Sequence, residues 1–147
     1  MSGKGVDTTE TLRLPHHVSS AGVVRRRVWE DLGAHGVAPR LAADVALVLT
    51  ELIGNSVRHA SPLSDGEVEI SWKMRANGVE LRVTDGGGNV VPAQRTVGTD
   101  EVSGRGLSIV AKVAAAWGVE STALGTTVWA FVTGGHRRRT GDRVRLA

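Results

Sequence analysis

The hydrophobic periodicity of the chain changes from helical to strand-like between residues 60 and 67, and this change constrains the fold most strongly. Over 39–60, apolar side chains recur at helical spacing, which predicts an amphipathic helix. They are Leu41, Val45, Val48, Leu49 and Leu52. Over 67–74 and 79–85, apolar and polar residues alternate, as in half-buried strands. Asn77 and Gly78 separate these two runs and favour a tight turn, so we predict a long helix followed by an antiparallel hairpin.

The flanking segments complete the order of elements. Their patterns predict a strand at 11–15, a helix at 17–33, a helix at 105–118 and final strands at 118–123 and 126–132. A strand, two helices, a hairpin, a helix and a second hairpin in this order are typical of an α+β fold. We therefore predict a two-layer sandwich in which helices pack on one face of a mainly antiparallel sheet.

The composition is that of one globular domain. Of the 147 residues, 41% are hydrophobic and 22% are charged, which argues against a disordered chain. We place the domain at residues 11–133, with residues 1–10 as a flexible N-terminus. No apolar run approaches the roughly 18 to 20 residues that span a bilayer, and the first residues contain no signal-peptide core. Cysteine is absent, which excludes disulfides, so we expect a cytoplasmic protein with no membrane contact.

The positive charge is concentrated near the C-terminus. Residues 136–147 contain five Arg and one Asp, a net charge of +4. The other 135 residues contain 13 basic and 14 acidic side chains, a net charge of −1, and the two parts give the formal charge of +3. We interpret residues 134–147 as an Arg-rich, solvated tail. We expect no direct contact with nucleic acid, because the excess positive charge lies in the tail and not in a basic patch of the folded domain.

Three polar residues occur at four-residue intervals within the predicted helix 39–60. Glu51, Asn55 and His59 would lie on one face of that helix. On a helix rich in Leu, Val and Ala, a carboxylate, an amide and an imidazole in one stripe indicate either a solvated edge or a site. The stripe alone leaves both interpretations open.

Asp85 continues the core-facing alternation of the predicted strand 79–85. A carboxylate that points toward the core is costly unless it is hydrogen-bonded, so Asp85 is a candidate binding residue. The alternative is that the strand ends one residue earlier and Asp85 opens a turn. The glycines at 86–88 would let the backbone approach a ligand closely. The Gly-Arg-Gly at 104–106 precedes a predicted helix, where free N–H groups favour phosphate, although it also fits a flexible loop.

The order of these motifs resembles that of the GHKL, or Bergerat-type, ATP-binding superfamily over about residues 11–133. The motifs are the polar helix stripe, Asp85 with its glycines, the glycine pair at 104 and 106, and a late Gly-Thr at 125–126. The resemblance implies the Bergerat ATP-binding fold. Within the superfamily, the short chain and compact loop look most like the anti-sigma-factor serine/threonine kinases.

The resemblance implies a role for each matching residue. Glu51 matches the general base, and Asn55 matches the residue that binds Mg²⁺ at the nucleotide phosphates. Asp85 matches the aspartate that accepts a hydrogen bond from the adenine amino group. The other implied nucleotide-binding positions are Gly87, Gly104, Arg105, Gly106, Leu107 and Thr126. His59 would line the pocket rather than act in catalysis, and Arg58 is a candidate phosphate or surface contact.

One position departs from the superfamily pattern D-x-G-x-G. The chain reads DGGGN from residue 85, so Asn89 stands at the second glycine position. Asn adopts left-handed backbone conformations more readily than most residues. The departure therefore affects the expected loop geometry more than nucleotide binding itself.

The resemblance implies an ATP- and Mg²⁺-dependent protein kinase. It would bind a sigma factor, phosphorylate a serine of a small anti-sigma-factor antagonist and form a homodimer. A second interpretation is a module that binds ATP and a partner without transferring phosphate. A third is the catalytic domain of a sensor histidine kinase. The third is disfavoured because His16 and His17 do not lie on a long amphipathic helix pair that would carry a phospho-accepting His.

Overall fold

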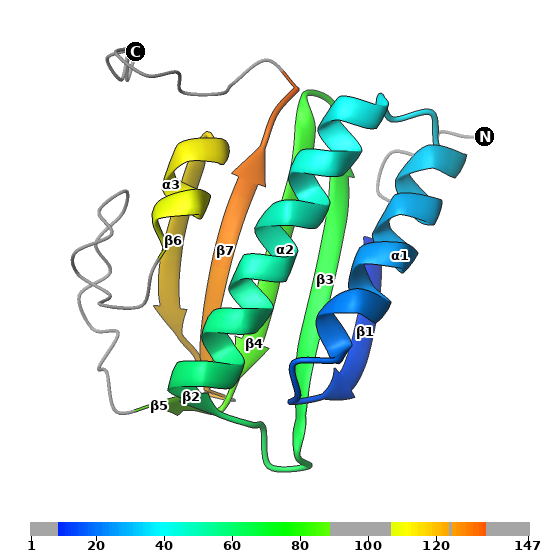
Figure 1. The fold of residues 1–147 in the computed structure, drawn as a ribbon. Helices are drawn as coiled ribbons and strands as arrows, with labels where there is room; N and C mark the ends of the chain where they lie inside the picture. The colour runs from blue at the N-terminus through cyan, green and yellow to red at the C-terminus, as the bar shows by residue number, and fades with distance from the viewer. Residues whose placement is uncertain (1–8, 89–106, 124, 135–147) are drawn as a thin grey trace.

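A computed structural model of the chain describes residues 9–88, 107–123 and 125–134. Its helices pack on one face of a five-stranded sheet with the order β1-β3-β4-β7-β6 (Figure 1). All neighbouring strands of this sheet are antiparallel.

The strands are β1 (Thr9–Pro15), β3 (Glu67–Arg75), β4 (Gly78–Asp85), β6 (Ala116–Ser121) and β7 (Thr126–Val132). The helices are α1 (Ser20–Ala34), α2 (Pro39–His59) and α3 (Ser108–Val113), and the short strands β2 (Ala60–Ser61) and β5 (Gly87–Gly88) pair separately. The predicted α+β sandwich is confirmed.

The hydrophobic core fills the layer between the helices and the sheet. The alternation predicted for the central hairpin is confirmed, because the alternating apolar side chains of β3 and β4 are buried there, apart from the partly buried Met74. The buried side chains of this interface include Val68, Ile70, Trp72, Val79, Leu81 and Val83 from the strands, and Val45, Val48, Leu49, Leu52 and Ile53 from α2. Burying each such side chain stabilises the folded state by roughly 1.5–3 kcal/mol relative to leaving it exposed, so the apolar face of α2 holds that helix on the sheet.

Helix α1 is attached to the sheet by apolar packing and by a part-buried hydrogen bond from β3. Val24, Val28 and Leu32 are fully buried on its inner face. The indole Nε1 of Trp72 in β3 donates a hydrogen bond to Asp31 Oδ2 of α1 at 2.8 Å. The contact satisfies an indole N–H that would otherwise be buried without a partner.

Two element boundaries near the N-terminus differ from the predicted ones. Strand β1 begins at Thr9, which pairs with Lys73, so the sheet starts two residues before the predicted strand 11–15. Helix α1 begins at Ser20 rather than at residue 17. The Nδ1 atom of His17 accepts a hydrogen bond from the Ser19 backbone N–H at 3.0 Å, and this local turn competes with helix formation.

The predicted helix 105–118 is too long. In the structure α3 ends at Val113, and the next residues enter β6. The backbone N–H of Ala115 donates to Phe131 O at 2.8 Å, and Ala116 then pairs with Phe131 in the sheet. Pairing with β7 therefore overrides the high helix propensity of the alanine run.

The sheet face opposite the helices carries both charged and aromatic side chains, because Arg82 and Glu80 of β4 pair with Trp129 and Phe131 of β7. Its ion pairs include Arg13–Glu69 at 3.1 Å, Arg75–Glu80 at 2.6 Å and Arg82–Glu120 at 3.0 Å. Within the described ranges, none of the helices combines the length and the apolar character that a membrane crossing requires.

Candidate nucleotide-binding site

Asp85 lies at the end of β4 in a buried polar cluster with Ser56. The residue is 2% exposed. The hydroxyl of Ser56 in α2 donates to Asp85 Oδ2, and the Gly87 backbone N–H donates to Asp85 Oδ1 at 2.8 Å. Each carboxylate oxygen thus holds one donor and can accept another, because each has two lone pairs. The inward orientation of Asp85 predicted from the alternation is confirmed, and the alternative of an earlier strand end is wrong.

Thr126 and Gly87 border this cluster. Thr126 is buried and pairs with Asp85 across β4 and β7. Gly87 has a φ of 89°, and a Cβ at this position would lie 3.2 Å from Thr126 Oγ1. A larger residue would therefore be strained and would press on the threonine hydroxyl. Asp85, Gly87 and Thr126, which the sequence singles out separately, are brought together here.

The glycines on either side of Gly87 contact the chain itself. Gly86 and Gly88 lie against the backbone of residues 59–62, and a Cβ at either position would overlap a carbonyl oxygen there. Gly88 pairs with Ala60, which joins β5 to the strand that follows α2. The sequence interpretation assigned these glycines to ligand approach alone and missed this backbone pairing.

The polar stripe of α2 approaches the same end of the fold, where α2 runs into β2 beside β5 (Figure 1). Asn55 is 2% exposed, Glu51 is half-buried one turn earlier, and His59 is exposed one turn later. The side chain of Arg58 donates from Nη2 to Asn55 Oδ1 at 3.1 Å. Among the described residues, Asn55 Nδ2 is buried without a hydrogen-bond partner. The amide thus keeps an unused donor.

The donor set fits a magnesium ion carried by a nucleotide better than a metal held by protein alone. No group of three or more metal-ligating side chains occurs in the described part of the chain. Magnesium commonly uses one or two protein oxygens and completes its shell with water and phosphate oxygens. The Asn55 amide oxygen is an oxygen of this kind, and the other ligands would be water and phosphate oxygens. Arg58 would have to leave Asn55 Oδ1 before this oxygen could bind a cation.

Two residues of the cluster were missed by the sequence analysis. Ser56 directly follows Asn55, but nothing in the pattern indicated that its hydroxyl contacts Asp85. His16, in the connection between β1 and α1, lies with Nε2 at 3.0 Å from Ser56 O and 3.1 Å from Ser56 Oγ. These contacts join segments 40 residues apart. The sequence contains no signal for either contact.

Of the remaining predicted site residues, only Leu107 lies in the part of the chain that the structure describes. Leu107 is buried in the hydrophobic core just before α3. Gly104, Arg105 and Gly106, and the divergent Asn89, lie outside the described residues. Their predicted roles stay predictions.

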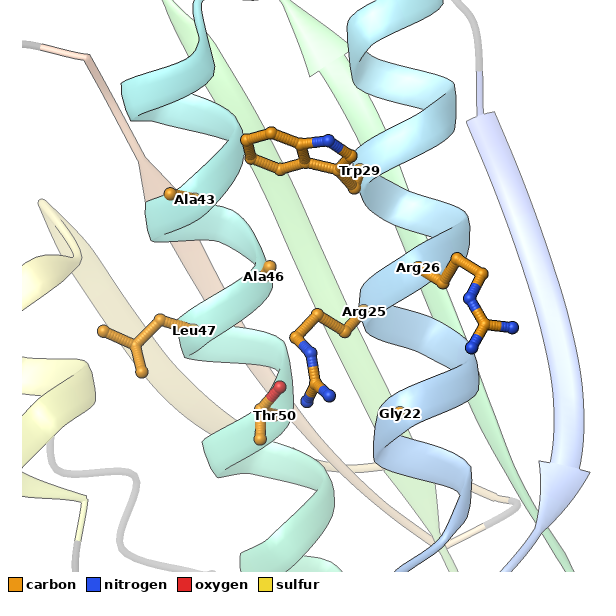
Figure 2. A pocket seen from close by; sticks show the side chains of 8 residues that line it. All are labelled: Gly22, Arg25, Arg26, Trp29, Ala43, Ala46, Leu47 and Thr50. Carbon is orange, nitrogen blue, oxygen red and sulfur yellow. The ribbon is translucent and has the colours of Figure 1, made fainter.

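A separate groove lies on the outer side of the helices, between α1 and α2. It is lined by Gly22, Arg25, Arg26, Trp29, Ala43, Ala46, Leu47 and Thr50. Figure 2 shows the side chains of Arg25 and Trp29 directed into the space between the two helices, with small residues of α2 opposite. Trp29 is 48% exposed and Leu47 is 38% exposed. Large apolar side chains beside exposed arginines are typical of protein-contact surfaces.

The fold and the cluster around Asp85 together define the class of the protein. A buried aspartate at a strand end, glycines after it and an asparagine-bearing helix beside it are the features by which the chain resembles a GHKL-type ATP-binding domain. The family described as histidine kinase-like ATPase domain matches residues 14–132, which is most of the chain. The chain belongs to this family, and membership implies ATP binding. No match is found among curated proteins.

Proposed function

We propose that the protein is an ATP-dependent protein serine/threonine kinase of the anti-sigma-factor type. It binds a sigma factor and transfers the γ-phosphoryl group of ATP to a serine of a small antagonist protein. The observation that carries the proposal is the buried Asp85 carboxylate, held by Ser56 and Gly87 beside the α2 stripe. A fixed acceptor in a buried site suits the exocyclic amino group of adenine and rejects guanine, which presents a carbonyl at that position.

The α2 stripe supports the transfer step. Glu51 is the proposed general base that takes the proton of the attacking serine hydroxyl. Asn55 is the proposed ligand of Mg²⁺, which neutralises phosphate charge when it is bound. The half-buried position of Glu51 leaves part of its side chain accessible to a second protein. Phosphoryl transfer needs mainly positioning and charge neutralisation, and these two residues supply groups suited to both.

The groove between α1 and α2 supports the partner-binding half of the proposal. Its exposed Arg25 and Arg26 beside Trp29 and Leu47 fit an amphipathic segment with acidic residues at its edge. We assign this surface to the sigma factor and keep a homodimer as part of the proposal. Binding to purified sigma factors should weaken in Arg25→Glu. It should be unchanged in Arg75→Glu, because Arg75 pairs with Glu80 on the sheet and does not line the groove.

The test of the kinase activity is incubation with γ-labelled ATP, Mg²⁺ and candidate antagonist proteins. Label on an antagonist serine, lost in Asp85→Asn, supports the kinase. Tight ATP binding without transfer to any antagonist overturns it. The Asp85→Asn control shows that the label depends on this site and not on a contaminating kinase.

A second function, an ATP-binding regulatory module without phosphotransfer, is favoured by one contact. Arg58 donates to Asn55 Oδ1, the oxygen that Mg²⁺ would need. If this contact persists in the ATP complex, a guanidinium rather than a metal lies at that oxygen, and the protein acts through partner binding alone. Magnesium-independent ATP affinity together with absent transfer distinguishes this module from the kinase.

A further inference from the structure

We propose that His16 is a positioning residue of the nucleotide site, which orients Asp85 through the hydroxyl of Ser56. The inference rests on the proposed recognition of adenine by Asp85. His16 belongs to none of the sequence motifs that indicate ATP binding, and it lies outside α2 and the glycine-rich segment. Its assignment comes from a chain of contacts that joins three separate parts of the fold.

The first link is the position of the imidazole. His16 follows β1, and its backbone N–H donates to Gly66 O at 3.3 Å, which ties this connection to the turn before β3. The β1–α1 connection and the end of α2 lie at the same end of the molecule (Figure 1). The half-buried ring thus reaches Ser56 across the helix-to-sheet boundary.

The second link is the direction of the hydrogen bonds. His16 Nε2 lies 3.0 Å from the carbonyl oxygen of Ser56 and 3.1 Å from its hydroxyl oxygen. A carbonyl oxygen only accepts, so Nε2 must carry the ring hydrogen. The Ser56 hydroxyl then faces His16 with a lone pair. Its single hydrogen is committed to Asp85 Oδ2, because an ionised carboxylate also only accepts.

The third link is the orientation of the carboxylate. Ser56 holds Asp85 Oδ2 and the Gly87 N–H holds Oδ1, so rotation of the carboxylate would break two hydrogen bonds. The lone pairs left for an amino group therefore point in fixed directions. Without His16, the Ser56 hydroxyl can rotate toward the vacated side, and Asp85 loses one of its two restraints. Preorganised acceptors bind better because less ordering is required on binding.

The test compares two nucleotides by calorimetry: ATP and purine ribonucleoside triphosphate, which lacks the amino group. Wild-type protein should prefer ATP by about tenfold, the size expected of one hydrogen bond to a charged acceptor. In His16→Ala and in Ser56→Ala this preference should fall to about threefold or less, with the affinity for the purine analogue unchanged. In His16→Gln it should recover, because the Gln amide N–H₂ can donate to the same oxygens.

The neighbouring His17 provides the matched control. Its side chain is exposed and contacts Ser19 Oγ at 2.8 Å within the local turn, so His17→Ala should keep the wild-type preference. An unchanged preference for ATP in His16→Ala overturns the proposal. An equal loss of affinity for both nucleotides also overturns it, because it would indicate a structural role only. Failure of His16→Gln to recover overturns the donor role.

A separate readout distinguishes failure of the proposal from failure of the proposed function. In the nucleotide-free protein, the ¹⁵N shifts of the His16 ring should show hydrogen on Nε2, and they should change in Ser56→Ala. If wild-type protein shows no preference for ATP while these shifts behave as expected, adenine recognition by Asp85 is wrong. Ring hydrogen on Nδ1 instead overturns the positioning role itself.

Discussion

The Arg58 side chain donates from Nη2 to Asn55 Oδ1 at 3.1 Å, so a surface cation is joined to a buried amide on the same helix. Arg58 is exposed and Asn55 is 2% exposed. A metal cation and a guanidinium cannot share one oxygen without strong repulsion. The contact therefore defines a nucleotide-free arrangement that must change before Asn55 takes the proposed metal role.

Arg58→Ala should increase the sensitivity of ATP binding to magnesium. Removing the competing donor frees Asn55 Oδ1 for the metal. We therefore expect the half-saturating Mg²⁺ concentration to fall by about threefold to tenfold. This change corresponds to the loss of one charge-assisted hydrogen bond, partly replaced by a hydrogen bond to water. Titration of Mg²⁺ at a fixed ATP concentration measures this half-saturating concentration. The control is Arg75→Ala, which removes an arginine of β3 that is paired with Glu80 of β4, and it should leave the Mg²⁺ requirement unchanged. A higher Mg²⁺ requirement in Arg58→Ala would instead make Arg58 a phosphate ligand.

Asp85→Asn should abolish measurable ATP binding while the domain stays folded. The substituted amide can present its N–H₂ group to the adenine amino group, and two donors repel each other where an acceptor is required. We expect a loss of at least about a hundredfold, because the site gains an unpaired buried polar group as well as losing a hydrogen bond. Calorimetry measures the affinity, and Asp65→Asn, in an exposed ion pair with Arg13, serves as the control. Unchanged affinity would remove Asp85 from the site.

The central part of the fold could be predicted because its local pattern of apolar and polar residues shows which side chains are buried. The alternation of Val79, Leu81 and Val83 continues to Asp85, so one strand pattern gives both the core face and the buried carboxylate. The α2 helix likewise carries both its apolar face and its polar stripe in one short segment. Such local periodicity needs no knowledge of the tertiary structure.

The other features depend on contacts between distant segments. The alanines after Val113 favour a helix locally, and only the pairing of Ala116 with Phe131 places them in a strand. The contact of His16 with Ser56 likewise joins residues 40 positions apart, and neither residue type indicates the other. A sequence pattern does not encode which distant backbone or side chain will be adjacent, so these parts emerge only from the fold.

Glu51→Ala should leave ATP binding intact and stop phosphoryl transfer. The residue is one turn from Asn55, and its proposed task is to accept a proton from the attacking hydroxyl. Loss of a general base lowers the rate by about 10²- to 10⁴-fold. Single-turnover labelling of the antagonist measures the transfer, and calorimetry measures the binding. Glu51→Gln keeps the size of the side chain without a base and should be equally inactive. Transfer at the wild-type rate in either variant would exclude Glu51 as the base.

Asp31→Ala should destabilise the domain without affecting the nucleotide site. The Trp72 indole N–H donates to Asp31 Oδ2 at 2.8 Å, and Trp72 is 1% exposed, so the substitution leaves a buried donor without this acceptor. An unsatisfied buried donor costs about 1–3 kcal/mol in the free energy of unfolding. Urea denaturation measures this loss. The neighbouring Glu30 is acidic, exposed and on the same helix, so Glu30→Ala controls for helix charge and should change stability by less than about 0.5 kcal/mol. Equal stability of the two variants would show that the Trp72–Asp31 hydrogen bond does not hold α1 on the sheet.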